Sequence, residues 1–271
     1  MDKIKIYTTA NRLAWNEAMP LHQKANKSKW DDLFSVPGYS VIREPELSHI
    51  RSLNLKGKKI AHLCCNNGVE LMSLINMGAR KGIGFDISDV AIAEANQRAK
   101  KFDSNCQFVQ SDVYEIPKAF NGAFDIVYLS IGCLGWLPDL KPLFKKALAL
   151  LNVSGVIFIH ESHPFAEMLP ADDRKDVNPL QIIEPYFKAE PYIESDGIDY
   201  IGNTSYKSEP MYWFVWTLSD IFNSLIKIGF RLEHFSEYPE DISTQHKRTE
   251  EAQAGIPLSY ILIARKQVAL E

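Results

Sequence analysis

Three short apolar strands, predicted one after another between Lys59 and Asp112, constrain the fold of this chain more than any other feature. They read KIAHLC, GIGFD and CQFVQ, and a helical pattern separates each strand from the next. Short apolar strands that alternate with helices are typical of a parallel sheet covered on both faces. The alternation continues with FDIVYLS, DLKPLFKKALALL and GVIFIH. Because crossover connections are right-handed, we expect a doubly wound sheet.

The end of the chain completes this sheet. TLSDIFNSLIKIGF predicts a helix, and RLEHFSEYP and LSYILIARK predict two strands with no helix between them, which indicates an antiparallel hairpin. The predicted fold class is therefore α/β. We expect a Rossmann-like doubly wound, mostly parallel seven-stranded sheet with an antiparallel edge strand, an N-terminal helical lid and an insertion after strand five.

The second strand ends in Asp86, 18 residues after Gly68. A carboxylate at this strand end is where a nucleotide ribose presents its paired hydroxyls. The turn Cys65-Asn66-Asn67-Gly68 precedes a helix over 69–77, and Asn and Gly both tolerate left-handed backbone. The first amides of that helix would face the ligand. These features predict a site for a nucleoside cofactor.

At these residues the chain resembles a class I S-adenosylmethionine-dependent methyltransferase of the small-molecule kind. That family has an acidic residue and a Gly-rich turn after the first strand, whereas here His62 stands at the acidic position and Cys64 and Asn66 at glycine positions, with Gly68 kept. The resemblance implies S-adenosylmethionine as methyl donor, S-adenosylhomocysteine as product and no metal. It implies that Asp86 binds the ribose, and that Asp112 binds the adenine amino group with Val113 flanking the ring. It also makes FDIVYLSIGCLGWLPDL the fourth strand and active-site loop. The full predicted cofactor set is Cys65, Asn66, Asn67, Gly68, Asp86, Ile87, Ser111, Asp112, Val113, Ser130 and Ile131.

With 271 residues, 46% of them hydrophobic, the chain can bury one large core, so we expect a single methyltransferase domain over 1–271. Its predicted parts are a lid and lead-in helix (1–57), a cofactor-binding core (58–163), a substrate-covering insertion (164–216) and a C-terminal helix with the edge hairpin (217–271). Leu13, Trp15, Met19 and His22 have near-helical spacing, which Pro20 interrupts. Within the insertion, residues 199–217 predict two aromatic strands around a polar turn. We expect the N-terminal segment to close over the cofactor and the insertion to wall the acceptor site, although both could serve only as packing.

Candidate catalytic residues follow the fifth strand. Alternation along a strand would point Glu161 and His163 to the pocket and turn His160 away. Either residue could act as a general base if the acceptor carries a proton that must leave, or could have a structural role. The candidates for binding a flat or partly apolar acceptor are aromatic: Trp136, Tyr206, Tyr212 and Trp213.

Charge and composition exclude several other classes. A formal net charge of −4 argues against a nucleic-acid partner, and no apolar run is long enough to cross a bilayer. No cleavable leader precedes the four cysteines, so we expect reduced thiols in a cytoplasmic protein. His62, Cys64 and Cys65 lack the spacing of a metal site. Two alternatives remain: a non-catalytic module that binds S-adenosylmethionine, and an NAD(P)-dependent oxidoreductase, for which a G-x-G-x-x-G turn is missing. The sequence leaves the acceptor, the methylated atom and the oligomeric state open.

Overall fold

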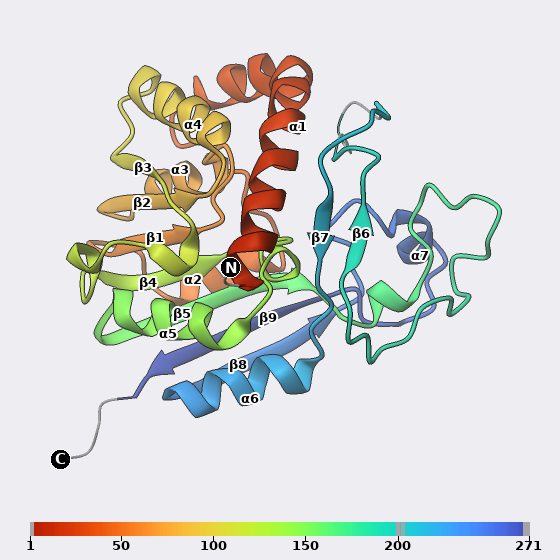
Figure 1. Ribbon diagram of the computed structural model, residues 1–271. Helices are drawn as coiled ribbons and strands as arrows, with labels where there is room; N and C mark the ends of the chain where they lie inside the picture. The colour runs from red at the N-terminus through yellow and green to blue at the C-terminus, as the bar shows by residue number, and fades with distance from the viewer. Residues whose placement is uncertain (1–2, 199–200, 202–203, 268–271) are drawn as a thin grey trace.

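The computed structural model describes residues 3–198, 201 and 204–267. Seven strands form one sheet in the order β3-β2-β1-β4-β5-β9-β8 (Figure 1). The first five strands pair in parallel, and β9 pairs antiparallel with both β5 and β8. This order confirms the predicted α/β fold, and the terminal hairpin lies at the sheet edge. Its antiparallel strand β9 is next to last and β8 forms the edge itself. The strands are β1 (Lys59–Leu63), β2 (Lys81–Asp86), β3 (Cys106–Gln110), β4 (Phe124–Leu129), β5 (Leu151–Ser162), β8 (Phe230–Tyr238) and β9 (Ser259–Lys266).

Helices cover both faces of the sheet. One face packs against α2 (Glu46–Ser52), α3 (Val69–Asn76) and α4 (Asp89–Lys101), through a core that includes Ile60, Leu71 and Phe158. The other face packs against α5 (Leu140–Leu150) and α6 (Leu218–Ile228), through Leu63, Phe144 and Leu225. The sequence therefore folds into three layers because its strands are apolar on both sides.

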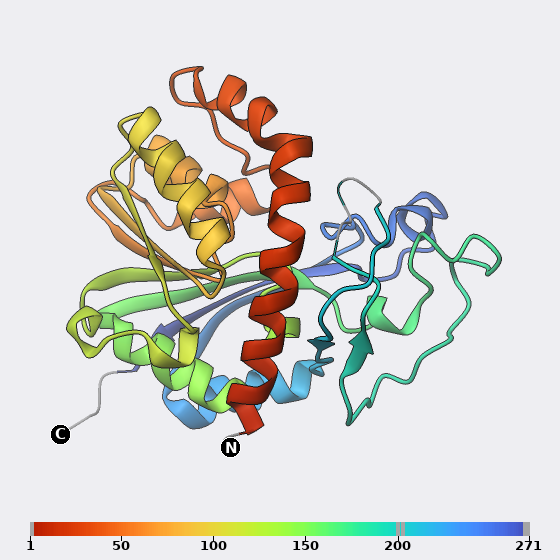
Figure 2. The same ribbon diagram turned by 45° about the horizontal axis from the view of Figure 1, so that its top comes forward.

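The N-terminal helix α1 (Lys3–Phe34) runs outside these layers and packs on α4 and on the insertion (Figure 2). Pro20 lies inside α1 without ending it, in contrast to the interruption predicted from the sequence. Ala18, Met19 and His22 flank the proline and are buried, so tertiary packing outweighs the hydrogen bond that proline cannot make.

The insertion lies beyond the carboxyl ends of the parallel strands and carries a small hairpin, β6 (Tyr192–Glu194) with β7 (Met211–Trp213). The predicted second strand is confirmed as β7, but its partner β6 lies upstream of the predicted segment. Residues 199–200 and 202–203 of that segment lie outside the described residues. Short 3₁₀ turns complete the chain: η1 (Val113–Glu115), η2 (Lys118–Phe120), η3 (Leu134–Trp136) and η4 (Ala166–Met168).

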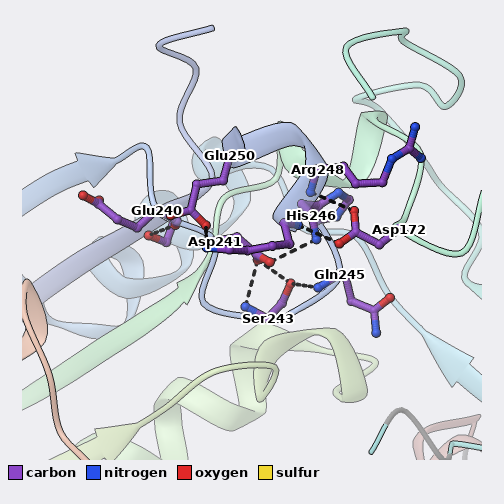
Figure 3. Close-up of polar contacts among 10 residues, drawn as sticks. Asp172, Glu240, Asp241, Ser243, Gln245, His246, Arg248 and Glu250 are labelled. Carbon is purple, nitrogen blue, oxygen red and sulfur yellow. Dashed lines mark hydrogen bonds and ion pairs between the residues drawn. The ribbon is translucent and has the colours of Figure 1, made fainter. Parts of the chain in front are cut away.

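A polar cluster fastens the far side of the insertion to the loop after β8. Asp172 accepts hydrogen bonds from the amides of Lys247 (2.9 Å) and Arg248 (3.1 Å) at the start of α7 (Lys247–Glu251) (Figure 3). Asp241 accepts from the Ser243 amide and from the His246 amide at 3.0 Å. Both aspartates therefore satisfy backbone donors in a segment without regular pairing.

Candidate active site

The turn after β1 has the backbone that a Gly-rich turn would have. Cys64 and Asn66 adopt left-handed φ values of 55° and 46°, and Gly68 has φ of 78°. A Cβ at Gly68 would lie closer than 3.0 Å to two ring atoms of Phe108, so this position requires glycine on space grounds as well. Gly68 is the N-cap of α3, and the first amides of that helix begin at the carboxyl edge. The turn therefore has the backbone conformation expected of a Gly-rich turn, although Cys64 and Asn66 stand where glycines are usual.

Asp86 lies beside this turn, and both of its carboxylate oxygens accept backbone hydrogen bonds. The Asn66 amide donates to Oδ2 at 2.8 Å and the Ser88 amide to Oδ1 at 2.8 Å. Burial raises the pKa of Asp86, while the backbone donors lower it. A carboxylate oxygen has two lone pairs, so each can still receive a ligand hydroxyl. The amides of Asn66 and Ser88 therefore fix the position of the Asp86 carboxylate.

A cleft of about 320 Å³ opens between α1 and the ends of β2 and β3. Ile87, Ser111 and Asp112 line its sheet side, and Asp112 is 8% exposed. The Asp112 Oδ1 accepts from the Tyr114 amide at 3.0 Å. Val113 instead packs in the core and is not among the residues that line the cleft. Helix α1 supplies the opposite wall with Lys5, Thr8, Thr9 and Arg12.

Polar contacts hold α1 over this cleft. Arg12 pairs with Asp89 at 2.9 Å, and the Asn16 amide group donates to the same carboxylate at 2.7 Å. Lys5 pairs with Glu115 across the mouth of the cleft at 2.6 Å. These side chains are largely exposed, so each pair contributes little to stability. They place α1 as a wall of the cleft rather than as part of the core.

The end of β1, which pairs with β4, carries the His that replaces the usual acidic residue. His62 is fully buried, its Nε2 lies 3.0 Å from the Ser130 Oγ, and burial lowers its pKa to about 3. The imidazole is therefore neutral at physiological pH, and its Nδ1 has no hydrogen-bond partner among the described residues. A neutral ring can accept a hydrogen bond from an ammonium group but supplies no negative charge. Ile131, which follows Ser130, is 45% exposed.

The other two residues of the turn act through their backbone. The Cys65 side chain is buried beside Gly84 in the core, and burial raises the pKa of its thiol. The Asn67 carbonyl accepts from Arg98 of α4 at 2.9 Å, and Arg98 pairs with Glu94 and with Asp31 of α1. This arginine is 2% exposed, so the turn is anchored to two helices by a buried charge.

The cleft and the turn fit a nucleoside cofactor. The cleft volume lies within the range of small-molecule sites. Asp112 and Asp86 offer acceptors to an amino group and to a pair of hydroxyls, and the α3 amides lie between Asp86 and β4. Among the described residues, no group of three or more His, Cys, Asp and Glu side chains lies close enough to hold a metal ion. The described helices include none with the length and apolar character needed to cross a membrane.

The end of β5 separates the three predicted ionisable residues. Glu161 is 4% exposed, and its Oε1 accepts from the Cys133 amide at 2.9 Å, at the start of η3. Burial raises the pKa of Glu161 to about 8. His160 faces the opposite side of the sheet, with Nδ1 at 3.3 Å from Glu46. The alternation expected along the strand is therefore present.

His163 has both ring nitrogens engaged. Its Nδ1 accepts from the Phe165 amide at 3.0 Å, so Nε2 carries the proton and donates to Glu237 Oε1, also at 3.0 Å. Burial lowers the pKa of His163, while the Glu237 carboxylate raises it. The ring fixes the chain where β5 enters the insertion, which is the structural role that the sequence left open.

The four predicted acceptor-binding aromatics lie in three places. Trp136 and Trp213 meet with ring centroids 5.1 Å apart, and Trp213 packs on Gly135 so closely that a Cβ there would overlap its ring. Tyr212 packs on Tyr7 of α1, with centroids 4.7 Å apart. Tyr206 packs on Gly197 in the hairpin loop. Trp213 alone of the four lines the pocket beside Glu161.

Three residues that the sequence did not single out complete this region. Glu167 of η4 accepts from the Trp213 indole N–H at 3.3 Å, and Tyr260 of β9 lines the same pocket as Glu161. Asn11 of α1 is 3% exposed and bonds to the backbone of β7: its Nδ2 donates to the Tyr212 carbonyl at 3.0 Å, and its Oδ1 accepts from the Tyr212 amide at 2.7 Å. A buried Asn is normally hydrogen-bonded, but nothing in the sequence of α1 marks Asn11 as buried, so the last contact could not be predicted.

The doubly wound sheet, the turn after β1 and the carboxylates at the ends of β2 and β3 define a Rossmann-like nucleoside-binding protein. Residues 60–155 match the family model described as a methyltransferase domain. The match spans the cofactor-binding core and confirms the resemblance to a class I S-adenosylmethionine-dependent methyltransferase that the sequence predicted.

The chain is similar to several individual proteins, one of which is a methyltransferase by name. A trans-aconitate 2-methyltransferase of Escherichia coli is 29% identical over 54% of this chain, which spans half of that protein's length. An uncharacterized protein of Haemophilus influenzae is 23% identical over 73% of this chain and 76% of its own length. A solved structure from Listeria monocytogenes superposes with a TM-score of 0.63 at 20% identity, covering 82% of this chain and 97% of that one, a likeness that establishes the fold.

Proposed function

We propose that the protein transfers the methyl group of S-adenosylmethionine to a small-molecule acceptor held between β5, η3 and the insertion. The observation that carries the proposal is the pairing of two sites at one sheet edge. The 320 Å³ cleft under α1 suits the nucleoside, and a second pocket, lined by Glu161, lies past the end of β4. The turn after β1 lies between them, where the methyl-bearing end of the cofactor would reach the acceptor.

Residues that line the cleft and residues of the neighbouring strand ends receive distinct roles in this proposal; Asp86 and the turn lie outside the cleft lining. Asp86 receives the ribose hydroxyls and Asp112 the adenine amino group, with Ile87 and Ser111 beside them. The Asn66 to Gly68 turn and the Ser130 and His62 pair hold the methionine end. Bound S-adenosylmethionine supplies an electrophilic methyl group, and the protein holds the acceptor in line with it.

We assign proton removal to Glu161 rather than to His163. The Glu161 carboxyl lines the acceptor pocket, and its raised pKa suits a general base near neutral pH. His163 has no free ring nitrogen, so it positions the start of the insertion. Trp213 forms the pocket wall, Trp136 supports it, and Tyr212 and Tyr206 shape the insertion behind it.

The acceptor of the Escherichia coli relative does not suit this pocket. A tricarboxylate needs cationic partners, whereas the described residues that line the pocket include two glutamates and no Lys, Arg or His. We therefore propose a different acceptor for this chain.

Calorimetric titration tests the proposal. S-adenosylhomocysteine should bind to the wild-type protein and NAD should not. Asp86→Ala should weaken S-adenosylhomocysteine binding by about 10- to 150-fold, the equivalent of a lost hydrogen bond to a charged group. Binding of NAD, or equal affinity in Asp86→Ala, would overturn the cofactor assignment. Binding without turnover across a broad acceptor panel would favour the non-catalytic module.

A further inference from the structure

The pocket beside Glu161 has an unusual combination of charge and aromatic surface. Two carboxyl groups line it, Glu161 from β5 and Glu167 from η4. Glu161 accepts from the Cys133 amide and Glu167 from the Trp213 indole, and neither pairs with a Lys, Arg or His among the described residues. Acidic groups this buried are normally paired with a cation. A positively charged ligand group in this pocket would therefore be balanced by the two carboxylates.

Tyr260 gives a second, independent indication. The residue is 0% exposed and lines the pocket, and its buried hydroxyl has no hydrogen-bond partner among the described residues. Buried polar groups are seldom left unpaired, and such a group at the wall of a pocket is one that a ligand can satisfy. The carboxylates and the hydroxyl could all accept hydrogen bonds from one donor group.

Aromatic rings form much of the remaining wall. Trp213 and Trp216 line the pocket together with Phe214, and the Trp216 indole N–H is already bonded to the Leu134 and Leu137 carbonyls. Indole faces attract cations through their quadrupole. The free space is about 30 Å³, enough for a small head group rather than a whole ring.

We propose that this pocket binds the ammonium group of the methyl acceptor, so that the substrate class is a small organic amine. This inference rests on the proposed methyl transfer. The ammonium donates to Glu161, Glu167 and the Tyr260 hydroxyl, and the Trp213 and Trp216 rings surround it.

The group transfer then balances in two steps. The acceptor ammonium, R–NH₃⁺, passes one proton to the Glu161 carboxylate and becomes R–NH₂. Its nitrogen lone pair forms the new N–CH₃ bond as the sulfonium C–S bond breaks and its electron pair stays on sulfur. The product is R–NH₂CH₃⁺, and the proton on Glu161 leaves to solvent.

Charge in the pocket fixes the pH dependence of amine binding. Burial, the Glu167 charge and the nearby groups keep Glu161 protonated below a pKa of about 8. Within the part of the chain that the structure describes, the titratable groups around the two carboxyls carry no positive charge: Cys133, Tyr186, Tyr192, Glu194 and Tyr260. Amine affinity should therefore rise between pH 6 and about 9 as the carboxyls ionise, until the ammonium itself deprotonates near about pH 10.

Two matched probe sets test the inference: n-propylamine, n-propanol and propionate, and 2-phenylethylamine, 2-phenylethanol and phenylacetate. Each is titrated into protein saturated with S-adenosylhomocysteine, by calorimetry and by fluorescence of the pocket tryptophans. Within a set, the amine should bind at least about tenfold more tightly than the alcohol, and the carboxylate most weakly. An alcohol or carboxylate that binds as well as its amine, two amines that fail to bind, or Mg²⁺ that displaces the amine would overturn it.

Variants locate the effect. Glu161→Gln and Glu167→Gln should each lower amine affinity by about tenfold while leaving alcohol and S-adenosylhomocysteine affinity unchanged. Glu209→Gln, an exposed carboxylate of the same insertion, is the matched control and should change neither. Tyr260→Phe should lower amine affinity several-fold without lowering the unfolding temperature, because its hydroxyl has no partner to lose. Failure of S-adenosylhomocysteine to bind would instead contradict the proposed function.

Discussion

Replacing Gly68 by Ala should separate two physical effects at the cofactor turn. Gly68 has φ of 78°, where an L-residue is strained by about 1–2 kcal/mol. The new Cβ would also overlap the Cζ and Cε1 atoms of Phe108, and overpacking of this kind costs about 1–3 kcal/mol. The expected loss of unfolding free energy is therefore about 2–5 kcal/mol, or roughly 5–15 °C in Tm for a domain of this size.

Gly57→Ala is the matched control. Gly57 has the same φ of 78°, but a Cβ there would meet nothing within 4 Å. Both variants gain the same rigidity in the unfolded chain, so their difference, about 1–3 kcal/mol, isolates the overlap with Phe108. Urea unfolding followed by circular dichroism measures both, and calorimetry with S-adenosylhomocysteine should show weaker binding in Gly68→Ala only.

Phe108→Leu provides a rescue, because leucine lacks the two ring atoms that a Cβ at residue 68 would meet. In this background, Gly68→Ala should lose little more than Gly57→Ala does, giving a coupling free energy of about 1 kcal/mol or more. Equal losses for Gly68→Ala and Gly57→Ala in the wild-type background, or no coupling with Phe108→Leu, would refute the steric reasoning.

Three further predictions follow from other parts of the site. Asp112→Ala should reduce the preference for S-adenosylhomocysteine over its inosine analogue; competition binding that shows an unchanged preference would remove Asp112 from adenine recognition. Cofactor should slow hydrogen exchange in α1 between Lys5 and Arg12 without any acceptor, since these residues line the cleft; unchanged exchange by mass spectrometry would reduce α1 to packing. His62 has a pKa of about 3 in the folded protein and about 6.5 in the unfolded chain, so it binds fewer protons when folded and the free energy of unfolding falls as pH drops below about 6.5. Between pH 7 and 4.5, His62→Asn should lose about 2–3 kcal/mol less unfolding free energy than wild type, as measured by urea unfolding. Equal losses would mean that His62 can be protonated in the folded protein.

The strands of the sheet and the helices between them could be predicted from local sequence patterns. Each strand from Lys59 onward buries apolar side chains whose period is visible in the sequence. The interruption predicted at Pro20 was wrong, because the burial of Ala18 and Met19 outweighs the tendency of proline to end a helix. The hairpin partner of β7 was misplaced because Tyr192–Glu194 is only three residues long and mostly exposed, so it has no apolar alternation that the sequence could show.

The site was predictable where chemistry follows from strand ends. Asp86 is the last residue of β2, Asp112 lies two residues beyond β3, and Glu161 is the penultimate residue of β5. Parallel strands bring these carboxyl ends to one edge. The hydrogen bond between His163 and Glu237 could not be predicted, because 74 residues separate the two in the chain. Glu167 and Tyr260 likewise reach the pocket from elements whose relative placement no local pattern encodes.

The three hydrogen bonds of Asn11 have a kinetic consequence. One amide side chain joins the helix that roofs the nucleoside cleft to the backbone of Tyr212 and to the Trp136 carbonyl at 3.2 Å. A ligand that restricts the motion of α1 therefore also restricts the motion of the aromatic residues beside the acceptor pocket. The binding free energies of the two substrates are then coupled through Asn11. Initial-rate measurements should then show an apparent KM for the acceptor that falls as the methyl-donor concentration rises, and the reverse dependence by the same factor in binding.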